Sequence, residues 1–319
     1  MCTSLKLEAR DVYFGRNMDI DFSYGKFVFT PRNYPIHLKK EKTIHSHYAI
    51  MGTAIVVDNY PLYGDAVNER GLGIAGLNFQ NFAYYFECIN ERRHYEITPY
   101  ELILWVLSQC ENVIEVKALL EKTILVNIPF NKDIPVAELH WHISDKNQSI
   151  VLECTKEGMK IYDNPVDVLA NNPEFDFHLK HLSCYLNLTQ DIPSNCLSKH
   201  DIKVYSKGMG AIGLPGDYSS PSRFVKMSYL KCLNTAKEND DLDVIQFFHL
   251  LESVSVPFDA IASNYRTAYT SCYNLEKGKY YYRSYFNPKI YRFDLSDFDL
   301  NGQELIVQSF DLEPEIIKM

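Results

Sequence analysis

The sequence predicts an α+β fold built from stacked layers of strands and helices, and the order of its segments carries this prediction. Segments typical of strands and of helices occur in blocks: strands, a helix pair, strands, a second helix pair, and strands again. A parallel sheet would require strands and helices to alternate one by one, which they do not. Two antiparallel sheets enclosed between two helix layers would satisfy this order.

Strand signals dominate the first half of the chain. Alternation at Leu5 and Leu7 predicts a first strand, followed by a turn near residues 8–11 and a returning strand from Tyr13. Segments 48–57 and 71–79 are short and apolar, which predicts strands buried on both faces. Segments 139–144 and 149–154 flank the polar turn DKNQ and are predicted to form a hairpin.

Helix signals follow in two places. The sequence TPYE at 98–101 is a capping box with proline at the first helical position, and the apolar run LILWVL comes directly after it. Further helices are predicted over 112–122, from Pro221 to residue 230, and over 241–252 with Asp241 as the cap. The late segment 265–291 is rich in tyrosine and alternates, so strands are expected again.

Composition and charge are those of a globular protein that does not bind nucleic acid. The chain has 319 residues, of which 46% are hydrophobic and 23% charged, and it contains no repeat, low-complexity segment or linker. One domain over residues 1–319 is therefore expected. The net charge is −9 and no long basic run occurs, whereas phosphate binding needs clustered Lys and Arg.

The N-terminus and the cysteines predict a cytoplasmic protein without a membrane anchor. Lys6, Glu8, Arg10 and Asp11 interrupt the first residues, so no secretory signal is expected. No window approaches the ~18 uninterrupted apolar residues of a membrane helix. The eight cysteines form no CxxC pair and no cluster with zinc spacing, which favours free thiols and predicts neither a metal nor a cofactor.

Cys2 directly follows the initiator methionine, and its small side chain permits removal of Met1. The residue would then carry a thiol with a pKa of about 8.5 and an α-amine with a pKa of about 7.7–8.0. A nucleophile and its base would thus belong to one residue. The structural alternative is an idle cysteine at a frayed terminus.

The returning strand YFGRNMDID can bring a charged pair back to Cys2. If it lies beside the first strand, Arg16 and Asp19 approach position 2. A guanidinium beside the thiol favours the thiolate, and a carboxylate can hold the α-ammonium. The alternative is a solvated surface pair that contributes little.

MCT followed by YFGRNMD resembles the choloylglycine hydrolase family, which includes bile salt hydrolases and penicillin V acylases among the N-terminal nucleophile hydrolases. Further matching motifs cover essentially the whole chain: NYPLYGDAVNERGLGIAGLNF, ELHWHISD, IYDNPVDVLANNPEF, IGLPGDYSSPSRF, QFFHLL and YTSCYNLEKGKYYY. The resemblance implies a four-layer αββα sandwich and a homotetramer.

The resemblance also implies a set of catalytic residues. Cys2 becomes the nucleophile and Arg16 and Asp19 its neighbours, while Asn78 supplies an oxyanion donor, Asn171 a second polar contact, and Arg223 a cation near the thiol. Neutral donors suit a site where oxyanion charge develops. Taken alone, the two asparagines would be structural loop residues and the arginine a surface charge. One departure is that Ala170 stands where threonine is expected before Asn171.

For the substrate, the resemblance implies a conjugated bile salt, whose amide to glycine or taurine would be cleaved. Its steroid body would need an apolar pocket, and the resemblance lines it with Met18, Val57, Phe130, Ile134 and Leu139. Asn78 stands where a penicillin V acylase would be expected to have tyrosine, which favours the bile salt enzyme. The alternatives are a penicillin V acylase, an N-acyl homoserine lactone acylase, and a non-catalytic protein that binds steroids or acyl groups.

Other motifs favour structural roles. His140 and His142 point the same way from one predicted strand, as do His45 and His47, but no third metal ligand has a persuasive spacing. The glycine-rich GLGIAG and KGMGAIGLPG lack the Lys and Ser/Thr of a phosphate loop. The tyrosine-rich segment is interpreted as packed strands rather than a stacking platform for nucleic acid.

Overall fold

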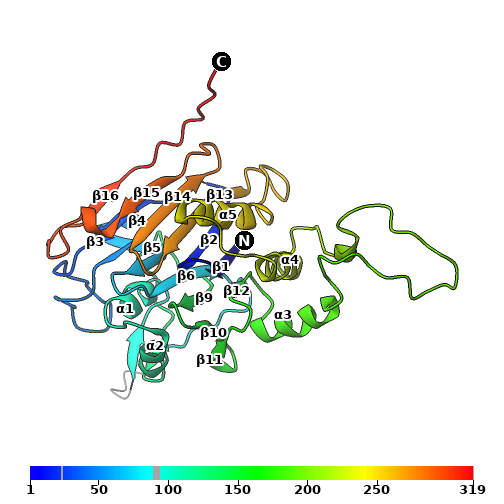
Figure 1. The fold of residues 1–319 in the computed structure, drawn as a ribbon. Coiled ribbons are helices and arrows are strands. Elements are labelled where there is room, and N and C mark those ends of the chain that lie inside the picture. The colour runs from blue at the N-terminus through cyan, green and yellow to red at the C-terminus, as the bar shows by residue number, and fades with distance from the viewer. Residues whose placement is uncertain (23, 89–93, 319) are drawn as a thin grey trace.

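The computed structural model describes residues 1–22, 24–88 and 94–318. Two large antiparallel sheets lie against each other, and helices cover their outer faces (Figure 1). Helix α1 packs on strands of the eight-stranded sheet, whereas α4 and α5 pack on the six-stranded sheet. This arrangement confirms the predicted layered α+β sandwich.

The six-stranded sheet contains the N-terminus. Its strands run in the order β12 (Val168–Leu169), β1 (Cys2–Glu8), β2 (Val12–Ile20), β13 (Arg266–Asn274), β14 (Lys279–Ser284) and β15 (Tyr291–Asp294). Strand β1 begins at Cys2 and lies between β12 and β2, so the start of the chain is fixed on both sides. The predicted turn before β2 and the tyrosine-rich strands β13 and β14 are confirmed.

The eight-stranded sheet has the order β11 (Gly158–Asp163), β10 (Ser149–Thr155), β9 (Leu139–Ser144), β6 (Gly73–Asn78), β5 (Tyr60–Asn68), β4 (Ile50–Val57), β3 (Lys26–Thr30) and β16 (Ile306–Gln308). The β9–β10 hairpin around DKNQ is confirmed, and β4 and β6 are buried along most of their length as predicted. Strands β7 (Tyr95–Ile97) and β8 (Thr123–Leu125) form a small parallel pair.

The helices differ from the prediction at their ends and in their number. They are α1 (Leu102–Leu107), α2 (Val113–Leu120), α3 (Phe175–Leu182), α4 (Ser220–Cys232) and α5 (Asp240–Glu252), with 3₁₀ turns at Ser183–Tyr185, Met209–Ala211 and Leu295–Asp297. The sequence did not predict α3. The Glu101 carboxylate does accept the Thr98 N–H at 2.9 Å, but α1 begins only after a turn at 99–101. Asn239, not Asp241, caps α5 by accepting the Leu242 N–H at 3.0 Å.

Two apolar cores hold the layers together. One lies between the sheets and under α4 and α5, with Phe14 and Phe247 among its members. The other lies between the eight-stranded sheet and α1 and α2, with Leu104 and Trp141 among its members. A sheet with apolar layers on both faces explains why β4 (IMGTAIVV) and β6 (GIAGLN) are nearly continuous apolar runs.

A long segment between α3 and α4 projects from the body of the molecule (Figure 1). This arm, residues 186–218, contains only a short 3₁₀ turn. Large apolar side chains are exposed along it: Leu186, Ile192, Leu197, Ile202, Tyr205 and Ile212. Within the described residues, no helix has the length and apolar character needed to cross a membrane.

Candidate active site

Pairing of β1 with β2 brings the predicted charged residues to Cys2. Cys2 lies directly opposite Met18, and the Asp19 N–H donates to the Met1 carbonyl at 2.9 Å. Cys2 is 3% exposed, while Arg16 and Asp19 are fully buried. The alternative of a solvated surface pair is therefore wrong.

The Arg16 guanidinium is held by carbonyls of the facing sheet. It donates to Gly64 O at 3.2 Å and to Gly76 O, which belong to β5 and β6. Burial disfavours its charge, but nearby negative groups, of which Cys2 is the largest contributor, raise its pKa above the ordinary value. Arg16 therefore remains a buried cation that interacts electrostatically with Cys2.

The two carboxylate oxygens of Asp19 have different surroundings. Oδ1 accepts the Thr267 hydroxyl at 2.6 Å. Oδ2 is buried and has no hydrogen-bond partner among the described residues, and the nearest cation is Arg223 Nη1 at 3.9 Å. A buried acceptor without a donor is costly, so Oδ2 is suited to receive a further donor at this centre. No pattern in the sequence singled out Thr267.

Asn171 connects the nucleophile to the other predicted residues. Its Oδ1 accepts the Cys2 N–H at 2.7 Å and Arg223 Nη2 at 2.7 Å, and its Nδ2 donates to Asn78 O at 2.8 Å. Arg223, from the first turn of α4, also donates to the Cys2 carbonyl. Because Met1 is present, Cys2 N is a peptide nitrogen here; it stands for the α-amine that loss of Met1 would expose.

Asn78 ends β6, and its side chain is exposed. Its Oδ1 accepts the Gln80 N–H at 2.8 Å, which fixes the orientation of the amide. The Nδ2 donor has no hydrogen-bond partner among the described residues. An oriented amide N–H that is open to solvent can donate to a negatively charged oxygen formed on a bound substrate.

Met1 is bonded beside this network. Its ammonium donates to Asp19 O at 2.8 Å and to the Tyr265 hydroxyl. Burial is the main cause that lowers the pKa of this ammonium. While Met1 is attached, Cys2 has no α-amine to act as a base.

Two of the predicted apolar residues lie beside the polar centre. Met18 faces Cys2 across β1 and β2, and Leu139 faces Asn78 across β9 and β6. Val57 lies at the tip of the β4–β5 hairpin, opposite Tyr60. Ile134 lies in the loop before β9 and is half-buried.

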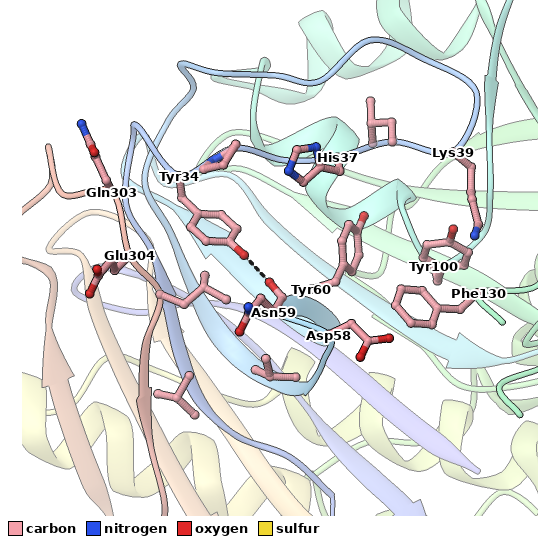
Figure 2. Close-up of a pocket in the computed structure, with 15 residues that line it drawn as sticks. Tyr34, His37, Lys39, Asp58, Asn59, Tyr60, Tyr100, Phe130, Gln303 and Glu304 are labelled. Atoms are coloured by element: carbon pink, nitrogen blue, oxygen red, sulfur yellow. Dashed lines mark hydrogen bonds between the residues drawn. The ribbon is translucent and has the colours of Figure 1, made fainter.

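The Phe130 side chain lines a separate cavity of about 800 Å³, which Figure 2 shows. Its ring packs against Tyr60 and Tyr100, with ring centroids 5.6 and 5.2 Å away, and Lys39 Nζ lies 6.0 Å from its centre. None of the six polar residues predicted for catalysis lines this cavity. The structure therefore bonds Asn171 and Arg223 to Cys2, places Arg16 and Asp19 on the neighbouring strand β2, and links Asn78 to Cys2 through Asn171. Phe130 lines the separate cavity instead.

The predicted strand histidines make structural contacts. His142 lies between the Ser4 and Ser149 hydroxyls at 2.8 and 2.9 Å, and burial lowers its pKa to about 3. His140 lies between Glu153 and the Ala170 carbonyl. In the ranges that the structure covers, no group of three or more His, Cys, Asp or Glu side chains is arranged to hold a metal ion.

Comparison with known proteins gives a consistent result. The model of the family described as linear amide C–N hydrolases, choloylglycine hydrolase family, matches residues 2–308. A bile salt hydrolase/transferase of Lactiplantibacillus plantarum is 45% identical over 99% of this chain and 98% of its own length. A mutant conjugated bile acid hydrolase from Clostridium perfringens superposes with a TM-score of 0.92 at 35% identity, covering 100% of this chain and 99% of the other.

A penicillin V acylase from Agrobacterium tumefaciens has the same fold at lower similarity. Its TM-score is 0.74 with 19% identity, over 96% of this chain and 90% of the other. At this identity the likeness extends to the fold alone.

Proposed function

The chain belongs to the choloylglycine hydrolase family of linear amide C–N hydrolases, and from that premise we propose that it hydrolyses conjugated bile salts with Cys2 as the nucleophile. One observation carries the mechanism: Cys2 N, Asn171, Arg223 and Asp19 form one buried polar network at the start of β1. The substrate class rests on relatives named for bile salt hydrolysis that match nearly the full chain.

The reaction begins after removal of Met1. The new α-amine of Cys2 keeps the acceptor Asn171 Oδ1 and gains Asp19 Oδ2, which has no other donor. In its uncharged form the amine takes the proton of the thiol, directly or through one water. Arg16 then stabilises the thiolate by its charge.

The thiolate attacks the amide carbonyl between the bile acid and glycine or taurine. Asn78 Nδ2 donates to the oxyanion of the tetrahedral intermediate. The C–N bond breaks, the leaving amine takes the proton from the α-ammonium, and an acyl-thioester remains on Cys2. The α-amine then deprotonates a water, which hydrolyses the thioester and regenerates the thiol.

The steroid body requires an apolar surface beside this centre. Met18 and Leu139 supply its inner end, because they face Cys2 and Asn78. Val57 and Ile134 supply its outer end from the hairpin tip and the loop before β9, whereas Phe130 lines the separate cavity and is not assigned to this surface.

A second activity follows from the same intermediate. Relatives from Lactiplantibacillus plantarum and Clostridium perfringens are named hydrolase/transferase. If an amine other than glycine or taurine reaches the thioester before water, its nitrogen takes the acyl group and a new conjugate forms. We therefore expect product conjugates when an amino acid is added in excess.

The decisive experiment incubates purified protein with glycocholate, taurocholate, penicillin V and an N-acyl homoserine lactone, and measures the released amine or acid. Intact mass on the same sample reports whether Met1 is gone, and a Cys2→Ser variant serves as the control. Bile salt cleavage with an inactive variant supports the proposal. Dominant cleavage of penicillin V or of the lactone would instead assign the protein as a penicillin V acylase or an N-acyl homoserine lactone acylase. Binding of bile salt without turnover, unchanged in the variant, would mean a non-catalytic binder.

We also propose that the protein is a cytoplasmic homotetramer. All eight cysteines are free, which suits a reducing compartment. The apolar side chains exposed along the arm would be buried against other subunits. Leu197→Asp together with Tyr205→Asp should lower the mass measured by light scattering, whereas Ile316→Asp in the exposed C-terminal tail should not. An unchanged tetramer in the double variant would exclude the arm as an assembly surface.

A further inference from the structure

Three buried side chains fix the backbone of Asn171, and none of them was predicted from the sequence as part of the site. The Asn171 N–H donates to Ser220 Oγ at 2.7 Å, and the Asn171 carbonyl lies 2.7 Å from His178 Nε2. The carbonyl of the preceding Ala170 lies 3.0 Å from His140 Nε2. These contacts come from α4, α3 and β9, so three separate elements converge on two consecutive peptide groups.

Elementary hydrogen-bond chemistry assigns the proton positions in this arrangement. A carbonyl oxygen can only accept, so Nε2 of both histidines must carry hydrogen. His140 Nδ1 faces Glu153 Oε1 at 3.1 Å, and the same carboxylate accepts the Phe175 N–H at 3.0 and 3.2 Å. Glu153 therefore fixes the plane of the His140 ring and joins it to the start of α3.

The two histidine rings are buried, and each stacks on a phenylalanine ring. His140, His178 and Glu153 are fully buried. Phe79 stacks on His140 with ring centroids 4.4 Å apart and an interplanar angle of 9°, and Phe224 stacks on His178 at 4.9 Å. Phe79 follows Asn78 and Phe224 follows Arg223, so the same rings also locate two further residues of the site.

We propose that His140, His178 and Ser220 are positioning residues that hold the Asn171 amide at the Cys2 nitrogen. The inference rests on the proposed function, because it takes Asn171 to be part of the catalytic centre. Asn171 Oδ1 must meet both the Cys2 nitrogen and Arg223 at 2.7 Å. A shift of about 1 Å in such a group can lower a rate about 100-fold. The His140 contact to the Ala170 carbonyl holds the peptide group that precedes Asn171.

Helix α4 offers a matched pair of variants for the test. Ser220 and Ser228 are both 8% exposed, but the Ser228 hydroxyl has no hydrogen-bond partner among the described residues, whereas Ser220 holds Asn171. Ser220→Ala should lower kcat for glycocholate about tenfold with KM changed less than about twofold, since only the alignment of the centre changes. Ser228→Ala should leave both constants within about twofold of the parent. Equal effects of the two variants on kcat would overturn the proposal.

Substitution of His178 adds a rescue test. His178→Leu removes the donor to Asn171 O, and kcat should fall about 100-fold. The side-chain amide of His178→Gln can donate to the same carbonyl, so it should recover most of that loss. A glutamine variant that folds like the parent but is as slow as the leucine variant would contradict a positioning role. If the leucine variant does not fold, the glutamine variant is compared with the parent directly, and a fall of about 100-fold would contradict it.

Asn171→Ala separates this proposal from the proposed function. A severe loss of turnover in Asn171→Ala and Cys2→Ser, together with equal behaviour of the two serine variants, would retain the function and reject the positioning role. Full turnover in Asn171→Ala would show that Asn171 is not needed for catalysis. It would then also reject the proposal that His140, His178 and Ser220 act by positioning Asn171.

Discussion

Thr267 orients the carboxylate of Asp19 from a strand distant in sequence. Its hydroxyl donates to Oδ1 at 2.6 Å and accepts the Val256 N–H at 2.7 Å, so it is held on both sides. The contact leaves Oδ2 without a hydrogen-bond donor among the described residues. The Thr267 hydroxyl thus hydrogen-bonds only one oxygen of the Asp19 carboxylate, and the two oxygens differ in their surroundings.

Thr267→Val keeps the shape of this side chain and removes the hydroxyl. Asp19 Oδ1 would lose its donor, and we expect kcat to fall at least about tenfold with a loss of stability of about 1–3 kcal/mol. Steady-state kinetics with glycocholate and urea unfolding measure the two effects. Thr270→Val is the control, because Thr270 donates to Asn17 Oδ1 on the same strand pair. If the control loses as much kcat as Thr267→Val, the loss reports general destabilisation.

The sequence identified the polar residues of the site only in part from physical reasoning. Cys2, Arg16 and Asp19 follow from one hairpin, whose pairing is local and therefore predictable. Asn171, Arg223 and Asn78 lie far away along the chain, and only the family resemblance pointed to them. Thr267, His178 and Ser220 carry no local signal, because a buried hydrogen bond depends on packing that periodicity does not describe.

At the scale of elements, helices α2 and α5 both begin with an asparagine N-cap. Asn112 and Asn239 have nearly identical extended backbones, and each side chain accepts an N–H three residues later at 3.0 Å. The two helices lie on opposite faces of the molecule and contact different sheets. Their caps are therefore independent contributions to stability.

Asn112→Ala and Asn239→Ala should each lower the free energy of unfolding by about 1 kcal/mol, and the double variant by about the sum. Neither should alter kcat, because the caps lie outside the site. Chemical denaturation of the three variants measures the cost. Asn195→Ala removes similar local bonds in the exposed arm and should change stability by less than about 0.5 kcal/mol. A double variant that loses no more than one single variant would refute independence.

Strong periodic segments were predictable, and short or irregular ones were not. Helices α2, α4 and α5 were expected within a few residues, as were β4, β6, β9 and β10. Helix α3 was missed because polar and charged residues interrupt its eight-residue sequence FDFHLKHL. Strand β12 spans only Val168–Leu169, which pair with Leu5 and Ser4 of β1, and two residues are too few to give a periodic signal.

At the scale of the whole molecule, buried histidines make stability depend on pH. Burial lowers the pKa of His142 to about 3 and of His178 to about 4, against an ordinary value of 6.5. The unfolded chain therefore binds more protons than the folded one below about pH 6.5. Stability from these groups is complete above that pH and is lost progressively as the pH falls toward 4.

Urea unfolding between about pH 7 and pH 5 should show a decreasing free energy of unfolding. Each histidine contributes a slope of at most about 1.4 kcal/mol per pH unit. His142→Gln removes one titrating group and should flatten the curve. A free energy that stays constant or rises on acidification would show that these rings are not held neutral.

The positions of the two chain ends determine how the protein should be produced for study. The N-terminal strand is enclosed by β12 and β2, and the first ammonium already lies partly buried against Asp19 and Tyr265. An affinity tag fused there would keep the α-nitrogen of Cys2 in a peptide bond. The C-terminal end projects into solvent, with Ile316 93% exposed (Figure 1). A purification handle therefore belongs at the C-terminus, and an N-terminal fusion should yield a folded but inert preparation until a protease cuts directly before Cys2.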